Sequence, residues 1–161
     1  MKKKIVYVGL AADIVHEGHI NILKTAARLG YVIVGLLTDK AIASYKKLPY
    51  LEFNQRKIIL QNIKYVDQVV EQKTLDYVEN LKSFKPSYVV HGDDWKIGIQ
   101  KKTRQRVIKT LKLWGGKLVE PKYTKNISSS KIKNKISSFG VTPQNRVSKL
   151  RRLLNVKKIV R

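Results

Sequence analysis

Hydrophobic and polar positions along the chain follow two periods in turn, which predicts strands alternating with helices. Residues 3–9 are mostly β-branched and apolar, as in a strand that is covered on both faces. Apolar residues then recur at helical spacing over 20–29, Gly30 is a stop signal, and 31–37 form a second buried strand. A strand, a helix and a strand within about 35 residues make a βαβ unit, whose strands must be parallel.

The alternation continues through the rest of the chain. Ile58, Ile59 and Ile63 fall on one helical face, which we expect to be its apolar side. Thr74 is a predicted helix cap, and Pro86 closes the same helix. Further strands are predicted at 68–70, 88–91 and 117–120, and further helices at 54–63, 74–84, 103–113 and 128–138. The pattern predicts an α/β fold, an open parallel sheet of about five strands with helices on both faces.

A change of pattern near the end of the chain predicts a domain boundary. Residues 1–138 would form the α/β domain, and 139–145 would form a linker. Residues 146–161 have leucines and valine at helical spacing among many basic residues, which predicts a basic amphipathic helix. This helix is expected to be either the start of a downstream domain or a remnant of one.

Composition narrows the class of protein. Hydrophobic residues make up 43% of the 161 positions, too many for a disordered chain. The absence of cysteine excludes disulfides and thiolate metal sites. No apolar run is long enough to span a bilayer, and the apolar stretch 5–10 is too short for a secretion signal. A cytoplasmic protein is therefore expected.

The formal net charge of +23 is concentrated in the second half of the chain. Residues 1–95 hold 14 Lys and Arg against 10 Asp and Glu, whereas 96–161 hold 20 against Glu120 alone. Such a half could bind phosphate-rich small ligands or nucleic acid. Most of these cations are lysines, which favour a solvated surface. That interpretation comes first, phosphate-rich ligands second, and nucleic acid is disfavoured as a partner.

The loop after the first strand is the predicted ligand site. In open parallel sheets, ligands bind beyond the carboxyl ends of the strands, where residues 9–19 lie. Gly9 lets the chain turn, Ala11 and Ala12 leave room against the backbone, and Gly18 permits close approach at the helix start. The free amides and positive dipole end of that helix favour a phosphate.

His16 and His19 are three residues apart and project from the same side of this helix start. They could donate hydrogen bonds to phosphate oxygens in a crowded transition state, where such donors are worth about 3 to 4 kcal/mol each. A zinc site is disfavoured, because the spacing differs from that of metalloprotease histidines and no third ligand is in register. The remaining alternative is that both histidines only cap or pack.

Four motifs, in order along residues 3–136, resemble those of the nucleotidyltransferase superfamily, and of its cytidylyltransferase family in particular. His16–His19 match HxGH, residues 64–69 resemble RYVDEV, 91–95 contain GDDW, and 127–132 resemble ISTTKI. The resemblance implies a Rossmann-like fold and transfer of CMP from CTP, with Mg²⁺ as cofactor and pyrophosphate as product. Since family members commonly pair, it also implies a homodimer.

The resemblance implies roles for individual residues. His16, His19 and Lys47 would be catalytic, Lys46 and Trp95 would bind the acceptor, and Asp94 would be a magnesium ligand. The serine run 128–130 would hold the β- and γ-phosphates, which agrees with three hydroxyls at a predicted helix start beside lysines. The nucleotide-binding residues would be Gly9, Ala11, Ala12, Asp13, Gly18, Lys64, Gly92, Asp93, Tyr123, Thr124, Ile127, Ser128, Ser129 and Ser130.

Some positions depart from the commonest pattern and bear on the acceptor. Val78 stands where the glycerol-3-phosphate enzymes place an acceptor-binding lysine, and 122–123 lack the usual arginine. The sequence 8–13 is more similar to cytidylyltransferase domains fused ahead of phosphoenolpyruvate mutase, whose opening helix 146–161 resembles. A small phosphonate such as 2-hydroxyethylphosphonate is therefore the expected acceptor. Alternatives are a glycerol-3-phosphate cytidylyltransferase, an adenylyltransferase, or a non-catalytic nucleotide- or RNA-binding module.

Overall fold

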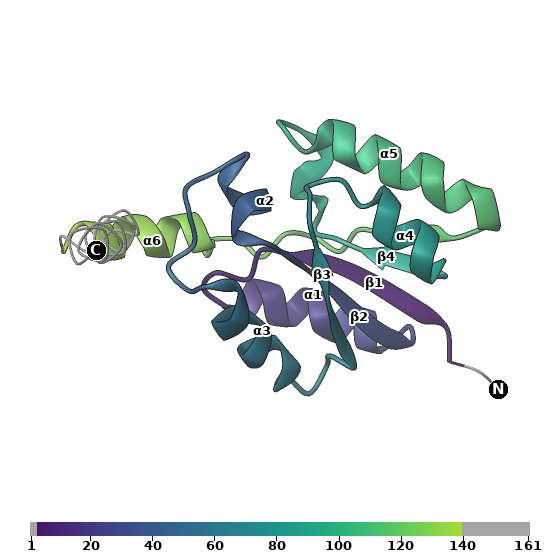
Figure 1. Cartoon of the computed structure of the whole chain (residues 1–161), viewed down its shortest axis with the longest axis horizontal. Helices are drawn as coiled ribbons and strands as arrows, with labels where there is room; N and C mark the ends of the chain where they lie inside the picture. Colours follow the sequence, from purple (N-terminus) through teal and green to yellow (C-terminus); the bar gives the residue numbers. More distant parts are fainter. Residues whose placement is uncertain (1–2, 140–161) are drawn as a thin grey trace, which may run out of the picture.

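A parallel sheet of five strands, in the order β3-β2-β1-β4-β5, forms the centre of the protein (Figure 1). The structure is a computed structural model that describes residues 3–139. The strands are β1 (Ile5–Leu10), β2 (Tyr31–Leu37), β3 (Gln68–Gln72), β4 (Tyr88–Val90) and β5 (Lys117–Val119). The predicted fold class is confirmed. Because the chain leaves β1 for β2 on one side and returns to β4 on the other, the sheet has a switch point at the carboxyl end of β1.

Helices cover both faces of this sheet, and alternate strand residues supply the two cores. On one face, Val6 and Val8 pack with Leu23 of one helix and Leu60 of another. On the opposite face, Tyr7 packs with apolar residues of two further helices. The helices are α1 (Glu17–Ala27), α2 (Asp39–Ala43), α3 (Phe53–Gln61), α4 (Val78–Phe84), α5 (Lys101–Leu111) and α6 (Ser129–Ser137), with short 3₁₀ turns η1 (Asp93–Lys96) and η2 (Lys112–Trp114).

Helix α3 is rotated relative to the prediction. Ile58 and Ile59 are 61% and 40% exposed, whereas Arg56 and Leu60 are fully buried. The guanidinium of Arg56 donates to the carbonyl oxygens of Ala11 and Leu51 and pairs with the Asp39 carboxylate. These hydrogen bonds replace the water that the buried charge has lost, so the arginine, rather than the isoleucines, sets the face that α3 turns inward.

Helix α4 begins later than predicted. Its first residue is Val78, and Tyr77 at the cap position is 4% exposed. Thr74 does not cap the helix, since its hydroxyl donates to the carbonyl oxygen of Asp76. The segment before α4 therefore lies at the carboxyl edge of the sheet instead of forming helix.

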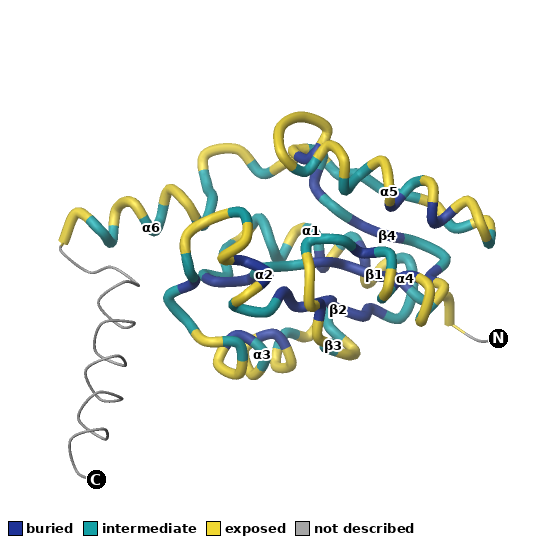
Figure 2. Tube along the Cα trace, turned by 45° about the horizontal axis from the view of Figure 1, so that its top comes forward, coloured by how far each residue is buried: buried dark blue, intermediate teal, exposed yellow. Residues whose placement is uncertain are grey.

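Helix α6 extends beyond the carboxyl edge of the sheet, at the left of Figure 1. None of its residues is buried, as the absence of dark blue along it shows in Figure 2. The predicted linker beyond Phe139 and the predicted helix 146–161 lie outside the described residues. Within residues 3–139, no helix has the length and hydrophobicity needed to cross a membrane.

Candidate functional site

A cavity of about 240 Å³ opens at the switch point, where the ends of β1, β2 and β4 meet. Its walls come from segments that are far apart in the sequence: the loop after β1, the segment after α2, the residues around Tyr77, the turn after β4 and the start of α6. Of the residues expected from the sequence, the cavity is lined by Gly9, Ala11, His16, Gly18, His19, Lys46, Gly92, Asp94, Tyr123, Thr124, Ser128, Ser129 and Ser130.

The two histidines of the first motif lie side by side in this cavity. Their ring centroids are 4.1 Å apart. His16 is the N-cap of α1, and its Nδ1 accepts a hydrogen bond of 3.1 Å from the Gly18 amide. The Nδ1 of His19 accepts one of 3.3 Å from the His16 amide, so the pair forms a reciprocal capping box.

This capping arrangement also determines which ring nitrogen carries the proton. An Nδ1 that accepts a hydrogen bond cannot hold a proton, so each neutral ring carries its hydrogen on Nε2. Burial lowers the pKa of His16, and burial together with the nearby His16 and Lys46 lowers the pKa of His19 to about 3. Both rings are therefore neutral near pH 7, and each offers one N–H donor to a ligand in the cavity.

Two glycines make this packing sterically feasible. A Cβ on Gly18 would lie 2.9 Å from the His16 ring, and one on Gly9 would lie 2.3 Å from the Tyr77 ring. Either side chain would displace a ring that lines the cavity. The glycines in the loop after β1 therefore provide room for aromatic side chains as well as for a ligand.

The triple serine forms the start of α6, as predicted from the sequence. Ser128 is the N-cap, and its hydroxyl accepts a hydrogen bond of 3.1 Å from the Lys131 amide. The Ser129 hydroxyl donates to the carbonyl oxygen of Ile14 at 3.3 Å, which joins this helix start to the loop after β1. All three serines line the cavity, so an anion there would meet hydroxyls and the first amides of a helix.

One cation and one carboxylate lie among the described residues that line the cavity, Lys46 and Asp94. The ammonium of Lys46 lies 5.2 Å from the centre of the Tyr45 ring. Lys46 is an exposed residue, yet the surrounding walls desolvate its ammonium, and this desolvation, followed by the charge of Lys133, lowers its pKa. Lys46 forms no ion pair with a carboxylate of the described residues, so its charge is available to an anionic ligand.

No group of three or more His, Asp or Glu side chains within residues 3–139 could hold a metal ion by itself. Asp94 could contribute one carboxylate. Mg²⁺ commonly binds through one or two carboxylates together with substrate phosphates, and it keeps several waters. The chemistry of the cavity therefore fits a magnesium ion that arrives with a phosphorylated ligand.

Aromatic and amide side chains in the wall were not expected from the sequence. Tyr45, Tyr77, His91 and Gln100 all line the cavity. His91 follows β4 directly, so the rule that ligands bind beyond the carboxyl ends of parallel strands could have indicated it. The other three approach from connecting segments, and only the folded chain brings them together.

Trp95 does not reach the cavity, contrary to the prediction that it binds the acceptor. It is 1% exposed, and its Nε1 donates to the Glu120 carboxylate at 2.7 Å. Its ring stacks on His91 with centroids 3.8 Å apart and planes 7° apart. Trp95 therefore supports a cavity residue from behind.

Lys47, predicted to be catalytic, and Lys64, predicted to bind the nucleotide, do not line the cavity. Lys64 precedes β3, at the amino edge of the sheet opposite the cavity, and its ammonium lies over the Tyr65 ring. Lys47 is exposed and is not part of the wall, whereas its neighbour Lys46 is. Spacing along the chain could not distinguish the two, because the choice depends on how the segment after α2 turns.

Four further residues predicted to bind nucleotide instead shape the loops around the cavity. Ala12 is 1% exposed with a left-handed backbone (φ 48°). The Asp93 carboxylate accepts a hydrogen bond from the Tyr123 amide, and the carbonyl oxygen of Ile127 accepts one from the Tyr123 hydroxyl. Asp13 is 2% exposed and accepts hydrogen bonds from the amides of the 50–51 segment.

Comparison with known proteins finds one family and several individual proteins whose sequences are similar to this chain. Residues 7–135 match the family described as Cytidylyltransferase-like. A glycerol-3-phosphate cytidylyltransferase of Bacillus subtilis (strain 168) is 39% identical over 103 residues, which are 60% of this chain and 74% of that protein. An ethanolamine-phosphate cytidylyltransferase of Mus musculus is 32% identical over 122 residues, 74% of this chain and 29% of that protein. A FAD synthase of Korarchaeum cryptofilum (strain OPF8) is 35% identical over 101 residues, 59% of this chain and 67% of that protein.

Solved structures share the fold at lower identity. A lipopolysaccharide core biosynthesis protein from Thermoplasma volcanium GSS1 matches with a TM-score of 0.64 and 22% identity, covering 76% of this chain and 99% of that one. A pantothenate synthetase from Thermus thermophilus matches with a TM-score of 0.60 and 12% identity, covering 92% of this chain and 65% of that one.

Proposed function

The chain belongs to the cytidylyltransferase-like family, and from this premise we propose that it transfers CMP from CTP to a small phosphonate or phosphate ester. The observation that supports this most directly is the pairing of His16 and His19 with the serine start of α6 in one cavity. Two neutral N–H donors lie there beside a helix start suited to anions. Such donors and helix amides suit a triphosphate and the negative charge that develops in its transition state.

The reaction needs positioning more than it needs a base. An oxygen of the ionised acceptor attacks the α-phosphorus of CTP in line with the leaving group. The bond from the α-phosphorus to the bridging oxygen breaks as the new bond forms, and pyrophosphate leaves with the electron pair. The Nε2–H groups of His16 and His19 would donate to the oxygens of the α-phosphate, where charge increases.

Mg²⁺ is part of the proposal as an ion that would neutralise the phosphate charge when bound, with Asp94 as its protein ligand. The serine hydroxyls and first amides of α6 would hold the β- and γ-phosphates. Lys46 would then face the acceptor's anionic group, since it is the cation among the described lining residues.

The uncharged residues of the cavity wall favour an acceptor whose organic part carries no positive charge. Leu37, Tyr45, Leu75 and Tyr77 line the cavity and offer apolar and aromatic surface, and the Tyr45 ring lies beside the Lys46 ammonium. Asp94, the carboxylate among the described lining residues, would be committed to the metal. We therefore propose that 2-hydroxyethylphosphonate or glycerol 3-phosphate is used in preference to 2-aminoethylphosphonate or ethanolamine phosphate.

Pyrophosphate release measured with each of the four nucleoside triphosphates, Mg²⁺ and these four acceptors tests the proposal. Release with CTP and an uncharged-tail acceptor is expected, with no product when acceptor or triphosphate is omitted. Release with ATP instead would favour an adenylyltransferase, an alternative supported by the FAD synthase similarity. RNA binding with steep salt dependence and no release with any triphosphate would favour a non-catalytic module.

A further inference from the structure

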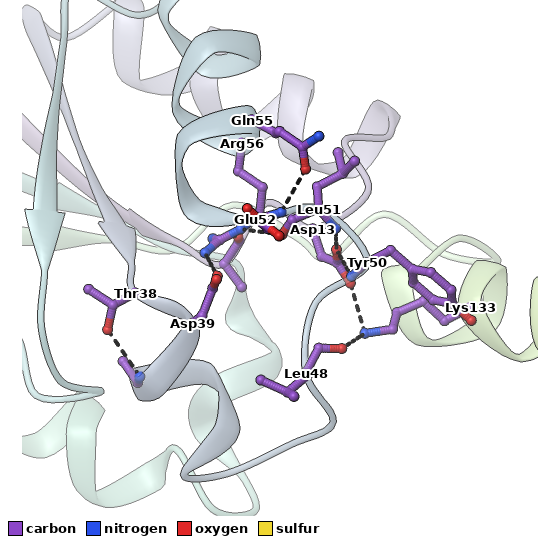
Figure 3. Close-up of polar contacts among 12 residues, drawn as sticks. Asp13, Thr38, Asp39, Leu48, Tyr50, Leu51, Glu52, Gln55, Arg56 and Lys133 are labelled. Carbon is purple, nitrogen blue, oxygen red and sulfur yellow. Dashed lines mark hydrogen bonds and ion pairs between the residues drawn. The ribbon is translucent and has the colours of Figure 1, made fainter. Parts of the chain in front are cut away.

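A buried ion pair outside the cavity wall joins segments that supply that wall. The Nζ of Lys133 in α6 lies 2.7 Å from Oδ2 of Asp13, in the loop after β1 (Figure 3). The Lys133 side chain is 13% exposed and that of Asp13 is 2% exposed. Such a pair is shielded from water, so losing one partner would leave an uncompensated charge.

The same two side chains also hold the segment that carries Lys46. Lys133 donates to the carbonyl oxygen of Leu48 at 3.0 Å. Oδ1 of Asp13 accepts from the amides of Tyr50 at 2.6 Å and Leu51 at 3.1 Å. Three chain segments, the loop after β1, residues 44–52 and α6, therefore meet at one ammonium and one carboxylate, as Figure 3 shows.

Helix α6 is held to the body of the protein chiefly by polar contacts. None of its side chains is fully buried, so no apolar core fixes its position. Two neutral hydrogen bonds help to attach it, one from the Ser129 hydroxyl to the Ile14 carbonyl at 3.3 Å and one between the hydroxyls of Ser137 and Tyr50 at 3.0 Å. Lys133 adds a charged contact, its ion pair with Asp13, to these two hydrogen bonds.

Each of the three joined segments contributes residues to the cavity. The loop after β1 contributes Ala11 and His16, residues 44–52 contribute Lys46, and α6 begins with the serines. A movement at Lys133 would shift the triphosphate end of the cavity relative to the acceptor end. Misplacement by about 1 Å can cost about 100-fold in rate.

We propose that Lys133 is a positioning residue that couples the phosphate-binding start of α6 to Lys46, so that the nucleotide and the acceptor sites form together. This rests on the proposed nucleotidyl transfer. The residue would contact neither substrate and would act only through Asp13 and the Leu48 carbonyl.

The matched pair Lys133→Met and Lys135→Met tests the proposal. Both remove one lysine charge from α6, but Lys135 is exposed and forms no ion pair with any described residue. Lys133→Met is expected to raise KM for CTP and to lower kcat, each by about tenfold. Lys133→Arg should recover part of the loss, and Lys135→Met should match the wild type.

A readout without turnover separates this inference from the proposed function. CTP binding should slow amide hydrogen exchange in residues 44–52 of the wild type, because α6 and that segment are joined. In Lys133→Met the protection should remain near the serines and be lost over 44–52. If the variant does not fold, Asp13→Asn, which retains an acceptor for the amides, is measured in its place. If CTP protects residues 44–52 as strongly in Lys133→Met, or in Asp13→Asn where that variant is used, as it does in Lys135→Met, the coupling is overturned.

Discussion

His16 and His19 cap helix α1, and the same two rings are proposed to act in catalysis. Their Nδ1 atoms accept from backbone amides, so the rings are held in orientation by the main chain. Preorganised donors of this kind need no rearrangement when charge develops on the ligand. The structural and chemical roles of the pair are therefore carried by different nitrogens of the same rings.

Removing either imidazole should affect turnover more than affinity. His16→Ala and His19→Ala are each expected to lower kcat by about 100-fold or more, because a donor to the transition state is lost. Pyrophosphate release at saturating CTP measures this. Lys24→Ala, an exposed substitution on the same helix, should leave kcat unchanged. Turnover at the wild-type rate in both histidine variants would remove the role proposed for them.

The low pKa of His19 predicts how stability depends on pH. The unfolded chain takes up a proton near the ordinary value of 6.5, whereas the folded chain does so only near 3. Between these values the unfolded state binds more protons, so the free energy of unfolding falls as pH falls, by up to about 1.4 kcal/mol per pH unit. His16 and His91, whose pKa values are also lowered by burial, act in the same direction.

Urea unfolding between pH 7 and pH 5 checks this, since Glu120, with an ordinary pKa of 4.5 that is lowered to about 2 in the folded chain, titrates mainly below this range in both states. His19→Gln, which cannot be protonated, should show a shallower dependence than the wild type. An identical dependence in the two proteins would mean that His19 is solvated in the folded state.

Residues that line the cavity could be found from sequence where a motif lies at a strand end or a helix start. His16, His19 and the serines 128–130 are of this kind, because local geometry alone places them at the carboxyl edge of the sheet. Lys47, Lys64 and Trp95 lie outside the cavity wall, since their positions depend on packing and on the course of connecting segments. Val78, which stands where the glycerol-3-phosphate enzymes place a lysine, does not line the cavity.

Among the elements, α3 and α6 show how polar contacts can override apolar pattern. The face of α3 predicted to be inward was wrong because Arg56 needs buried acceptors, and no periodicity in the sequence marks that need. In α6 the start was predicted correctly from the serine cap, but the Lys133–Asp13 pair joins positions 120 residues apart in sequence and could not be foreseen. Strand positions, by contrast, follow from apolar runs and were recovered.

The cap of α6 can be tested separately from the ion pair. Ser128→Ala removes the hydroxyl that accepts from the Lys131 amide, which should destabilise the first turn by about 1 kcal/mol. Because α6 has no buried residue, the loss should appear as faster hydrogen exchange in α6 and a higher KM for CTP, with little change in the melting temperature. Ser138→Ala, at the other end of the helix, should change neither the KM nor the exchange at 129–131.

For the whole molecule, the net charge of +23 should act on substrate capture. A strongly positive protein attracts a triphosphate from a distance, and added salt screens this attraction. We expect kcat/KM for CTP to fall as KCl rises from about 0.05 M to 0.5 M, while kcat changes little. Initial rates at fixed Mg²⁺ measure both quantities. A kcat/KM that is insensitive to salt would place the excess lysines among solvated surface groups with no part in capture.

The stacking of Trp95 on His91 gives the protein an internal optical reporter. The chain has two tryptophans, and Trp114 donates to the Pro86 carbonyl at the amino end of β4, away from the cavity. A ligand that touches His91, or a proton taken up by its ring, would change the electronic environment of the Trp95 indole alone. Intrinsic fluorescence, with Trp114→Phe to remove the background, would then follow the arrival of ligand in real time.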